Sequence, residues 1–415
     1  GVQTCALPIC RDQRHRRTYE LRDGILAEID RRAQDPWVAV IPGVPTRDAD
    51  GCFIDVHDVD GSRVLTRDGV PCSPLGWHVE AVIDVSQQGV LLQAAHEPEN
   101  RVIARVSDGQ FAALTPIDTW AAATASGDVR VEVQSTLTRS GAQACIVDGS
   151  HRVPVESFAE VPSVRPKPRL VRVGSRGFST AILLPASHVD GDRWPVICSP
   201  YGGPHAQRVV SSANAYLTEQ WLADQGFAVV IADGRGTPGR GSEWEYAVSR
   251  NLADPVLIDQ VDALLAAGQV EPALDLTRVG IRGWSFGGYL AALAVLDRPD
   301  VFHAAVAGAP VTDWRLYDTA YTERYLGDPS IDDGPYQTSS LIERASRLSR
   351  PLLLIHGLAD DNVIAAHTLL LSAALLAEAK PHNVLPLSGV THMTPQEIVA
   401  ENLLWTEVEF FRKNL

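Results

Sequence analysis

The chain has 415 residues, a formal net charge of -15 and an apolar share of 45%. It is too long for one compact core, so we expect two domains. The negative charge disfavours a nucleic-acid partner, because phosphate backbones are attracted by basic surfaces.

The cysteines give no sign of a disulfide framework or a metal site. They lie at positions 5, 10, 52, 72, 145 and 198, with no CxxC spacing and no Cys/His ligand pattern. We interpret most of them as buried thiols and expect neither a metal nor a cofactor. The sequence also lacks a run of about 18 apolar residues, so we expect no membrane segment.

The first residues do not look like a natural beginning. The chain starts with Gly1, contains a single methionine, Met393, and opens on GVQTCALPI. Back-translation of this opening resembles a read-through sequencing adapter, and such foreign segments are set aside before fold reasoning. We therefore expect residues 1–9 to be foreign and the natural protein to continue further upstream.

Residues 10–163 alternate short apolar segments with turn signals. The segment CFIDVHDVDGSRVLTRDG at 52–69 shows the pattern, with Asp-Gly pairs between alternating runs. Repeated units of about 40 residues predict blades of a β-propeller, and a β-sandwich gives the same pattern. Since only about three to four blades fit, we expect a partial propeller.

The pattern changes after the Pro-rich stretch VPSVRPKP at 161–168, which predicts a linker. Over residues 164–415, apolar strands alternate with amphipathic helices, as in a parallel sheet covered on both faces. The strands are expected at 180–184, 195–199, 227–232, 278–283, 304–309, 352–356 and 383–387. The helices are expected at 214–225, 256–267, 287–296, 365–379 and 395–411.

The segment GWSFGG, residues 283–288, lies where a predicted strand meets a predicted helix. This is the pattern of a nucleophile elbow, in which Ser285 takes strained backbone angles and the flanking glycines avoid a collision. We expect the Ser285 hydroxyl to project from the sheet as a nucleophile. A glycine-rich turn that happens to fit GxSxG is the alternative.

A serine nucleophile needs a general base, and the base needs an acid that fixes its tautomer. The strand at 352–356 runs into LADDN, so either Asp360 or Asp361 lies at the carboxyl end of a parallel strand. Of the twelve histidines, His392 alone lies in the loop before the last helix. An exposed loop residue is the alternative for His392, and we interpret His356 as structural.

The order Ser, Asp, His predicts an α/β hydrolase, with a doubly wound and mostly parallel sheet, preceded by a partial all-β propeller. Its transition state needs donors for a developing oxyanion. We expect one donor to be the backbone N–H of Phe286. The other is the hydroxyl of Tyr201 in YGGPH, where glycines permit close backbone approach; packing is the alternative role for Tyr201.

Four segments together resemble the prolyl oligopeptidase family of serine peptidases, most closely its dipeptidyl peptidase IV branch: GWSFGGY, HGLADDNV, the YGGP loop and VTDWRLYDTAYTERY. The resemblance implies that Ser285 is the nucleophile, Asp360 the triad acid and Tyr201 an oxyanion donor. It implies substrate contacts from Asn362 to a carbonyl, from Val363 to the specificity pocket, from Arg324 to the amino-end subsite, and from a proline slot of Val311, Trp314, Tyr317 and Tyr321.

Flat aromatic rings stack well on a rigid pyrrolidine, so the slot favours proline, and also alanine, before the scissile bond. A core stripe on one helix is the alternative for Trp314, Tyr317 and Tyr321. Two departures from the family are visible. Phe286 stands where the family commonly has tyrosine, and the paired glutamates that bind a free amino terminus in the family have no match here, so we expect them upstream.

These observations predict a serine peptidase that releases X-Pro or X-Ala dipeptides from short peptides through an acyl-enzyme on Ser285, with His392 moving the proton. An acylaminoacyl peptidase, oligopeptidase or esterase is the alternative among enzymes. A catalytically silent binding protein is the alternative of another class. The expected partners are short peptides, without nucleic acid, and a homodimer of the full-length protein stays open.

Overall fold

The computed structural model describes residues 4–6 and 10–415, and the chain folds into two compact units. Unit 1 takes the chain up to Arg165, together with Val210–Ala215 and Pro238–Tyr246. Unit 2 takes Pro166–Val209, Tyr216–Thr237 and Ala247–Leu415. We expected residues 1–9 to be foreign. Of these nine residues the structure describes only 4–6, which form a strand, and the others lie outside the described residues.

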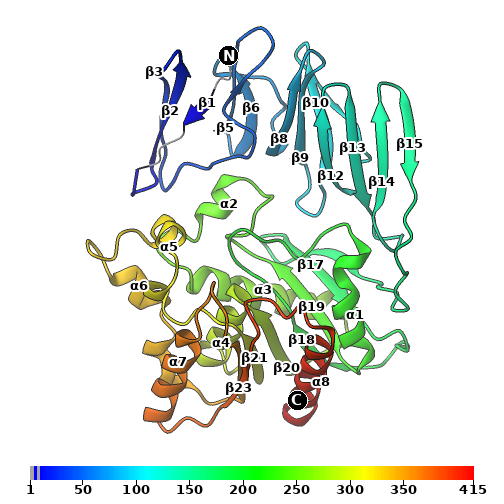
Figure 1. Ribbon diagram of the computed structural model, residues 1–415. Helices are drawn as coiled ribbons and strands as arrows, with labels where there is room; N and C mark the ends of the chain where they lie inside the picture. Colours follow the sequence, from blue (N-terminus) through cyan, green and yellow to red (C-terminus); the bar gives the residue numbers. More distant parts are fainter. Residues whose placement is uncertain (1–3, 7–9) are drawn as a thin grey trace. The chain divides into compact units, whose positions relative to one another are not determined.

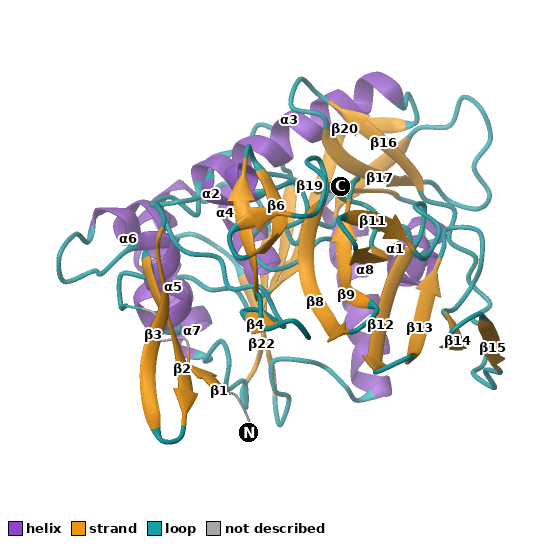
Figure 2. Cartoon of the chain, turned by 90° about the horizontal axis from the view of Figure 1, so that it is seen from above, coloured by secondary structure: helices purple, strands orange, loops and turns teal. Residues whose placement is uncertain are grey.

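Unit 1 contains four antiparallel sheets that follow one another in chain order (Figures 1 and 2). Successive small antiparallel sheets are the predicted propeller blades. The first sheet comprises β1 (Thr4–Ala6), β2 (His15–Arg22) and β3 (Ile25–Ala33). The second comprises β4 (Thr46–Arg47), β5 (Phe53–Val59), β6 (Ser62–Arg67) and β7 (Val70–Pro71). The third comprises β8 (His78–Ser86), β9 (Gly89–Ala95), β10 (Val102–Ser107) and β11 (Gln110–Ala113). The fourth comprises β12 (Trp120–Ser126), β13 (Val129–Ser135), β14 (Gln143–Asp148) and β15 (His151–Val155).

Asp-Gly pairs close several of these hairpins. Asp68 and Gly69 join β6 to β7 with φ values of 50° and 79°, and Asp108 and Gly109 join β10 to β11 with 50° and 72°. A type I′ turn requires positive φ at both central residues, and its twist matches that of the paired strands. The Asp-Gly pattern therefore predicted these hairpins for a physical reason.

A buried carboxylate connects the first two sheets of unit 1. Asp55 on β5 is 1% exposed and accepts a hydrogen bond from Arg32 on β3 at 2.6 Å and another from Arg16 on β2. Although burial acts in the opposite direction, hydrogen bonds from His57 and Arg16 and the charge of Arg32 lower the pKa of Asp55 to about 2. Asp55 is therefore ionised between two guanidinium groups.

Unit 2 is built on one eight-stranded sheet of order β16-β17-β19-β18-β20-β21-β22-β23. The pairs β16–β17 and β17–β19 are antiparallel, and the other pairs are parallel. The strands are β16 (Arg169–Val173), β17 (Phe178–Leu183), β18 (Trp194–Cys198), β19 (Ala228–Asp233), β20 (Leu274–Trp284), β21 (Ala304–Gly308), β22 (Leu352–Gly357) and β23 (Asn383–Leu387). All seven predicted strands are present, and β16 is an additional one.

Helices lie on both faces of this sheet, which confirms the doubly wound α/β-hydrolase class (Figure 1). The rings of Trp221 on α1 (Leu217–Asp224) and Trp405 on α8 (Glu397–Asn414) are 5.0 Å apart, while α3 (Asp254–Val270) packs against α4 (Phe286–Asp297). The other α-helices are α2 (Ser242–Tyr246) in unit 1 and α5 (Thr319–Leu326), α6 (Gly334–Ser339) and α7 (Ala366–Ala377) in unit 2. Short 3-10 helices lie at η1 (Ala213–Tyr216), η2 (Trp314–Leu316) and η3 (Ile342–Arg347).

The cysteines differ from the expectation of mostly buried thiols. Among the described residues, Cys198 is buried, Cys10 is exposed and the other three are half-buried. The reason is that Cys145 lies in β14 and that Cys52 and Cys72 lie just outside β5 and β7, where the small sheets of unit 1 cover less of each residue than the central sheet of unit 2 does.

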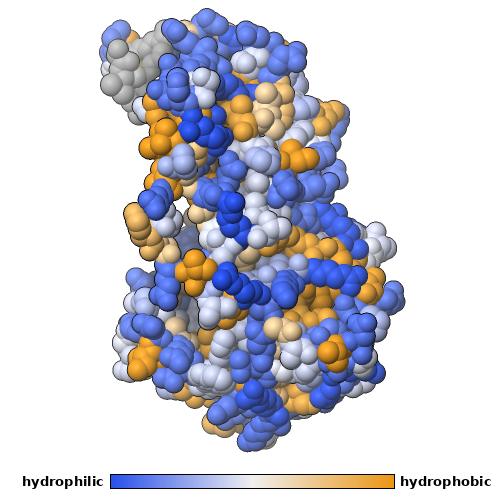
Figure 3. All heavy atoms as spheres, turned by 90° about the vertical axis from the view of Figure 1, so that its right-hand side faces the viewer, coloured by the Kyte–Doolittle hydropathy of each residue, from blue (hydrophilic) through white to orange (hydrophobic). Residues whose placement is uncertain are grey.

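On the face drawn in Figure 3, hydrophilic side chains are interspersed with smaller apolar groups. A search of the described helices finds none with the length and apolar character that a membrane crossing needs.

Candidate active site

Ser285 lies in the sharp turn between β20 and α4. Its φ of 59° and ψ of -119° fall in a region that non-glycine residues rarely adopt, at a cost of about 1–3 kcal/mol. The backbone N–H of Ser285 donates to the carbonyl of Gly308 on β21 at 2.9 Å. The turn therefore has the geometry of a nucleophile elbow, and the neighbouring strand holds it in place.

The glycines around Ser285 are required by close approach of the main chain. A Cβ atom at Gly283 would lie 2.2 Å from the carbonyl oxygen of Gly287, and one at Gly287 would lie 2.7 Å from that of Pro200. Either contact is too short for a real side chain. The two glycines of GxSxG are therefore needed because β20, α4 and the Tyr201 loop approach one another closely.

Asp360 and His392 form a hydrogen-bonded pair. His392 Nδ1 lies 2.8 Å from Asp360 Oδ2, and Asp360 Oδ1 accepts from the backbone N–H groups of Asn362 at 3.0 Å and Val363 at 2.8 Å. The Asp360 side chain is fully buried, whereas Asp361 is exposed. The structure therefore pairs His392 with Asp360, which resolves the choice that the LADDN pattern left open.

A tryptophan brings the His392 loop to the elbow. Trp284, which precedes Ser285, donates from its indole Nε1 to the carbonyl oxygen of His392 at 2.7 Å. Because Nδ1 of His392 binds Asp360, its Nε2 is the nitrogen that remains for a serine hydroxyl. The loop before the last helix thus presents an imidazole whose tautomer is fixed by a buried carboxylate.

His356 has a different environment from His392. Its Nε2 lies 2.7 Å from the carbonyl oxygen of Val363 and its Nδ1 lies 2.7 Å from the hydroxyl of Thr368. Burial lowers the pKa of His356, so the ring is held neutral. Although Nε2 is 3.6 Å from Asp360, both nitrogens already have partners, which gives His356 a structural role.

Two hydrogen-bond donors converge near Ser285. Burial and the neighbouring Tyr317 raise the pKa of Tyr201 to about 12, and the interaction of its hydroxyl with the Ser285 side chain partly offsets the rise. The phenol therefore keeps its proton. Since α4 begins at Phe286, the backbone N–H of Phe286 belongs to the first helical turn, where the helix offers no acceptor.

Trp314, Tyr317 and Tyr321 come together without sharing a helix. Trp314 lies in the η2 turn, Tyr317 follows that turn, and Tyr321 lies on α5. The rings of Trp314 and Tyr321 stack at 5.9 Å, and the ring of Tyr317 meets that of Trp314 edge-on at 6.0 Å and that of Tyr321 at 5.3 Å. The alternative of a core stripe on one helix is therefore wrong, because the chain changes direction after Leu316.

The remaining predicted residues lie around this aromatic cluster. The hydroxyl of Tyr317 donates to Asn362 Oδ1 at 3.1 Å, which joins the cluster to the Asp360 loop. Val311 and Val363 are buried. Burial lowers the pKa of the His205 ring, and the nearby charge of Arg324 on α5 lowers it further.

Sequence reasoning did not single out His205, although the YGGPH segment contains it. Its Nε2 lies 2.8 Å from the hydroxyl of Tyr325, and its ring lies 5.3 Å from that of Tyr321. The position of His205 four residues after Tyr201, with a φ of 75°, gave no signal on its own. The contact with α5 depends on how the loop folds back.

The sequence profile of the Prolyl oligopeptidase family matches residues 213–415. These residues contain Ser285, Asp360 and His392, and they form most of unit 2. This half of the chain is therefore similar to members of the prolyl oligopeptidase family.

Proteins that this chain resembles include dipeptidyl peptidases. The chain is 37% identical to mouse dipeptidyl peptidase 8 over 237 residues, which cover 55% of this chain and 27% of that protein. It is 28% identical to a probable dipeptidyl peptidase 4 of Aspergillus flavus over 381 residues, or 80% of this chain and 48% of that protein. The chain thus spans from about a quarter to about half of the length of these relatives.

Solved structures extend the likeness to the whole chain. The Porphyromonas gingivalis dipeptidyl peptidase 4 structure matches 100% of this chain and 62% of its own, with a TM-score of 0.90 and 25% identity. A putative dipeptidyl aminopeptidase IV from Bacteroides ovatus matches 99% of this chain and 64% of its own, with a TM-score of 0.84 and 22% identity, which shows the fold.

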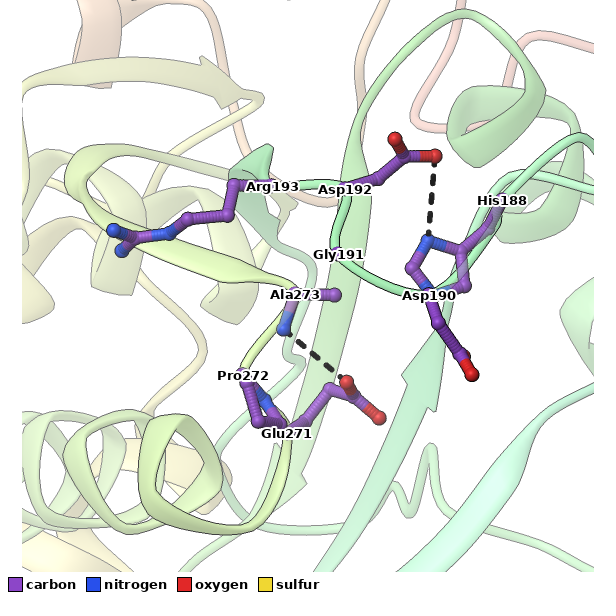
Figure 4. A pocket seen from close by; sticks show the side chains of 8 residues that line it. All are labelled: His188, Asp190, Gly191, Asp192, Arg193, Glu271, Pro272 and Ala273. Atoms are coloured by element: carbon purple, nitrogen blue, oxygen red, sulfur yellow. Dashed lines mark hydrogen bonds and ion pairs between the residues drawn. The ribbon is translucent and has the colours of Figure 1, made fainter.

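A separate cavity of about 370 Å³ in unit 2 lies outside the family motifs (Figure 4). Figure 4 shows His188 paired with Asp192 and Glu271 accepting from the backbone N–H of Ala273. The lining residues include no serine, threonine or cysteine: His188, Asp190, Gly191, Asp192, Arg193, Glu271, Pro272 and Ala273.

One group of potential metal ligands occurs among the described residues, and it lies in unit 1. The ligand atoms of Cys10, Asp12 and His15 are within 4.8 Å of one another, and all three residues are exposed. His15 Nδ1 already pairs with Asp12 at 3.1 Å. This group shares no residue with the site around Ser285.

Proposed function

We propose that the chain is a serine peptidase that releases N-terminal dipeptides ending in proline or alanine. One observation carries the proposal: the buried Asp360 carboxylate binds His392 Nδ1 at 2.8 Å while the His392 loop is tied to the residue that precedes Ser285. A strained serine, an oriented imidazole and a buried carboxylate are the parts that acyl transfer requires.

In the acylation step, Ser285 Oγ attacks the carbonyl carbon of the scissile bond as His392 Nε2 takes the hydroxyl proton. The carbonyl oxygen becomes an oxyanion that accepts from the Phe286 N–H and the Tyr201 hydroxyl. Collapse of this intermediate breaks the C–N bond, and the proton on His392 passes to the departing amine. Asp360 stabilises the imidazolium and fixes its tautomer throughout.

In the deacylation step, the same groups act on water. His392 Nε2 removes a proton from a water molecule that attacks the ester carbon, and the same two donors hold the second oxyanion. Breakdown returns the proton to Ser285 Oγ and releases the dipeptide carboxylate. Because the high pKa of Tyr201 keeps its hydroxyl protonated, this donor works across the neutral range.

The aromatic cluster supports the preference for proline. Trp314 and Tyr321 present parallel ring planes, and Tyr317 is perpendicular to both. A pyrrolidine packs its CH₂ groups against such faces and has little conformational freedom to lose on binding. Alanine, with its small apolar side chain, is the expected second choice.

The proposal is tested with chromogenic amides of Gly-Pro, N-blocked Gly-Pro and Ala-Ala, with the Ser285→Ala variant as control. We expect turnover of the free Gly-Pro amide and a loss of about four orders of magnitude or more in kcat in the variant. Cleavage of the blocked amide as well would indicate an oligopeptidase or acylaminoacyl peptidase. If none of the amides is cut in a Ser285-dependent way, the peptidase proposal fails and a binding role is left.

A further inference from the structure

The loop that carries Tyr201 is clamped at both ends by one buried carboxylate. Glu219 on α1 is 2% exposed; it accepts from the Ser199 hydroxyl at 3.4 Å, before the loop, and from the Arg208 guanidinium, after it. The backbone N–H of Arg208 also donates to Asp233 at 3.1 Å. The segment between 199 and 208 is therefore held at both of its ends.

A buried arginine connects this clamp to the strand of the nucleophile. Arg282 on β20, three residues before Ser285, places Nη1 3.4 Å from the Ser199 hydroxyl and 4.0 Å from Glu219 Oε1. On its other side, Arg282 donates from Nε to Glu407 on α8 at 2.5 Å and from Nη2 at 3.3 Å. The side chain of Arg282 is only 17% exposed.

The four charges alternate in sign along this path, from Arg208 through Glu219 and Arg282 to Glu407. Buried ion pairs are expensive to desolvate, and apolar side chains of similar volume often give equal or greater stability. A network of this kind therefore needs a reason other than stability. Fixed geometry is the best-attested reason, because charged hydrogen bonds hold partners at defined distances.

The geometry that needs fixing is that of the Tyr201 hydroxyl. The Phe286 N–H is part of a helix, but Tyr201 belongs to a loop that rests directly on the elbow. A Cβ at Gly203 would lie 2.3 Å from the ring of Phe286, and one at Gly287 would lie 2.7 Å from the oxygen of Pro200. Any sliding of the loop would therefore move the hydroxyl relative to Ser285.

We propose that Glu219 and Arg282 are positioning residues for oxyanion stabilisation, acting through the Tyr201 hydroxyl. This inference rests on the proposed function and adds two residues to its machinery. A misplacement of about 1 Å costs about 100-fold in rate. We therefore expect Arg282→Met and Glu219→Gln to lower kcat by about 10- to 100-fold with little change in KM.

The test is a double-mutant cycle with Tyr201→Phe. If Arg282 acts through the hydroxyl, Arg282→Met has less than about a 3-fold effect once the hydroxyl is gone. Turnover is expressed per site titrated with a fluorophosphonate, so loss of folded protein does not lower the value. Glu219→Gln keeps the shape of its side chain and repeats the cycle if Arg282→Met folds poorly.

Arg235→Met is the matched control. Arg235 forms a bidentate pair with the buried Asp259 in the same unit, its side chain is 22% exposed, and its guanidinium also donates to the carbonyl oxygen of Pro255. Removal of this guanidinium deletes a comparable ion pair that includes neither Glu219 nor Arg282. We expect kcat per titrated site to stay within about 3-fold of the parent.

The second readout is the rate at which the fluorophosphonate reacts with Ser285, since its phosphoryl oxygen also occupies the oxyanion position. This rate is measurable even if the chain cuts no peptide, so failure of the proposed function and failure of this inference are distinguishable. We expect the same 10- to 100-fold loss, and its disappearance with Tyr201→Phe. Equal losses in both backgrounds, or an equal loss in Arg235→Met, would overturn the positioning role.

Discussion

Gly69 in unit 1 and Gly308 in unit 2 show two different uses of glycine. Gly69 has a φ of 79°, and a Cβ there would meet nothing within 4 Å. Gly308 needs no left-handed backbone, but a Cβ there would lie 2.0 Å from the ring of Trp284. Gly69 thus serves the conformation of an open turn, whereas Gly308 permits close contact with a neighbouring ring.

The surroundings of Asp55 in unit 1 and of the Ser285 turn in unit 2 also differ. A buried charge, Asp55, links the first two sheets of unit 1 through Arg16 and Arg32. The elbow of unit 2 is held by main-chain contacts, such as the bond from Ser285 N–H to Gly308. Unit 1 should therefore respond most to loss of charge, and the elbow most to added volume.

The largest expected effect is that of Asp55→Asn. Removal of this charge leaves the buried Arg16 guanidinium with only the more exposed Asp30 as an anionic partner, which costs about 3–5 kcal/mol. Segment-resolved hydrogen exchange should show this loss in β2, β3 and β5, with little change in unit 2. Asp50→Asn is the control, because its pair with Arg67 is on the surface and is worth less than about 1 kcal/mol. Similar protection in both variants would contradict the role of Asp55.

Gly308→Ala comes next, with an expected destabilisation of unit 2 of about 3 kcal/mol. The added methyl group collides with Trp284, whose indole binds the His392 loop, so activity should fall further than folded protein does. Urea unfolding and kcat per titrated serine measure the two effects separately. An active variant with unchanged stability would show that the elbow tolerates volume and would remove the contrast between the units.

Acid should destabilise unit 1 through Asp55 by about 2 kcal/mol. The pKa of Asp55 is about 2 in the folded chain, against an ordinary value of 3.8. A depressed pKa in the folded state means that the stabilisation is complete above about pH 4 and is lost as the pH falls towards 2. The difference in hydrogen exchange between wild type and Asp55→Asn should therefore shrink below pH 4; a difference that stays constant would exclude this ionisation as the cause.

The smallest expected effect is that of Gly69→Ala. With open space around the turn, only the left-handed backbone opposes the methyl group, at a cost of about 1 kcal/mol. Gly69→Asn should cost less, because asparagine tolerates this conformation. Thermal unfolding of the two variants beside Gly308→Ala compares conformation with contact directly. A loss at Gly69 as large as that at Gly308 would contradict the comparison.

Local chemistry explains which features were predictable from the sequence. Asp-Gly turns, the seven strands and the pattern around Ser285 each depend on a few adjacent residues, and they were found. The edge strand β16 was missed because its alternation follows directly on the Pro-rich linker. A core stripe on one helix was the alternative for the aromatic residues, since their spacing suits a helix, but the turn after Leu316 is set by tertiary packing. The contacts of Arg282 join four segments that are distant in sequence, and no spacing in the sequence indicates these contacts.

The strained backbone of Ser285 sets a limit on how stable this protein can become. A glycine would adopt a φ of 59° and a ψ of -119° without the penalty that serine bears there. Selection for thermal resistance alone would therefore favour Ser285→Gly, which removes the nucleophile. Activity and stability thus compete at a single position, and any improvement in stability that preserves turnover must come from elsewhere in the chain.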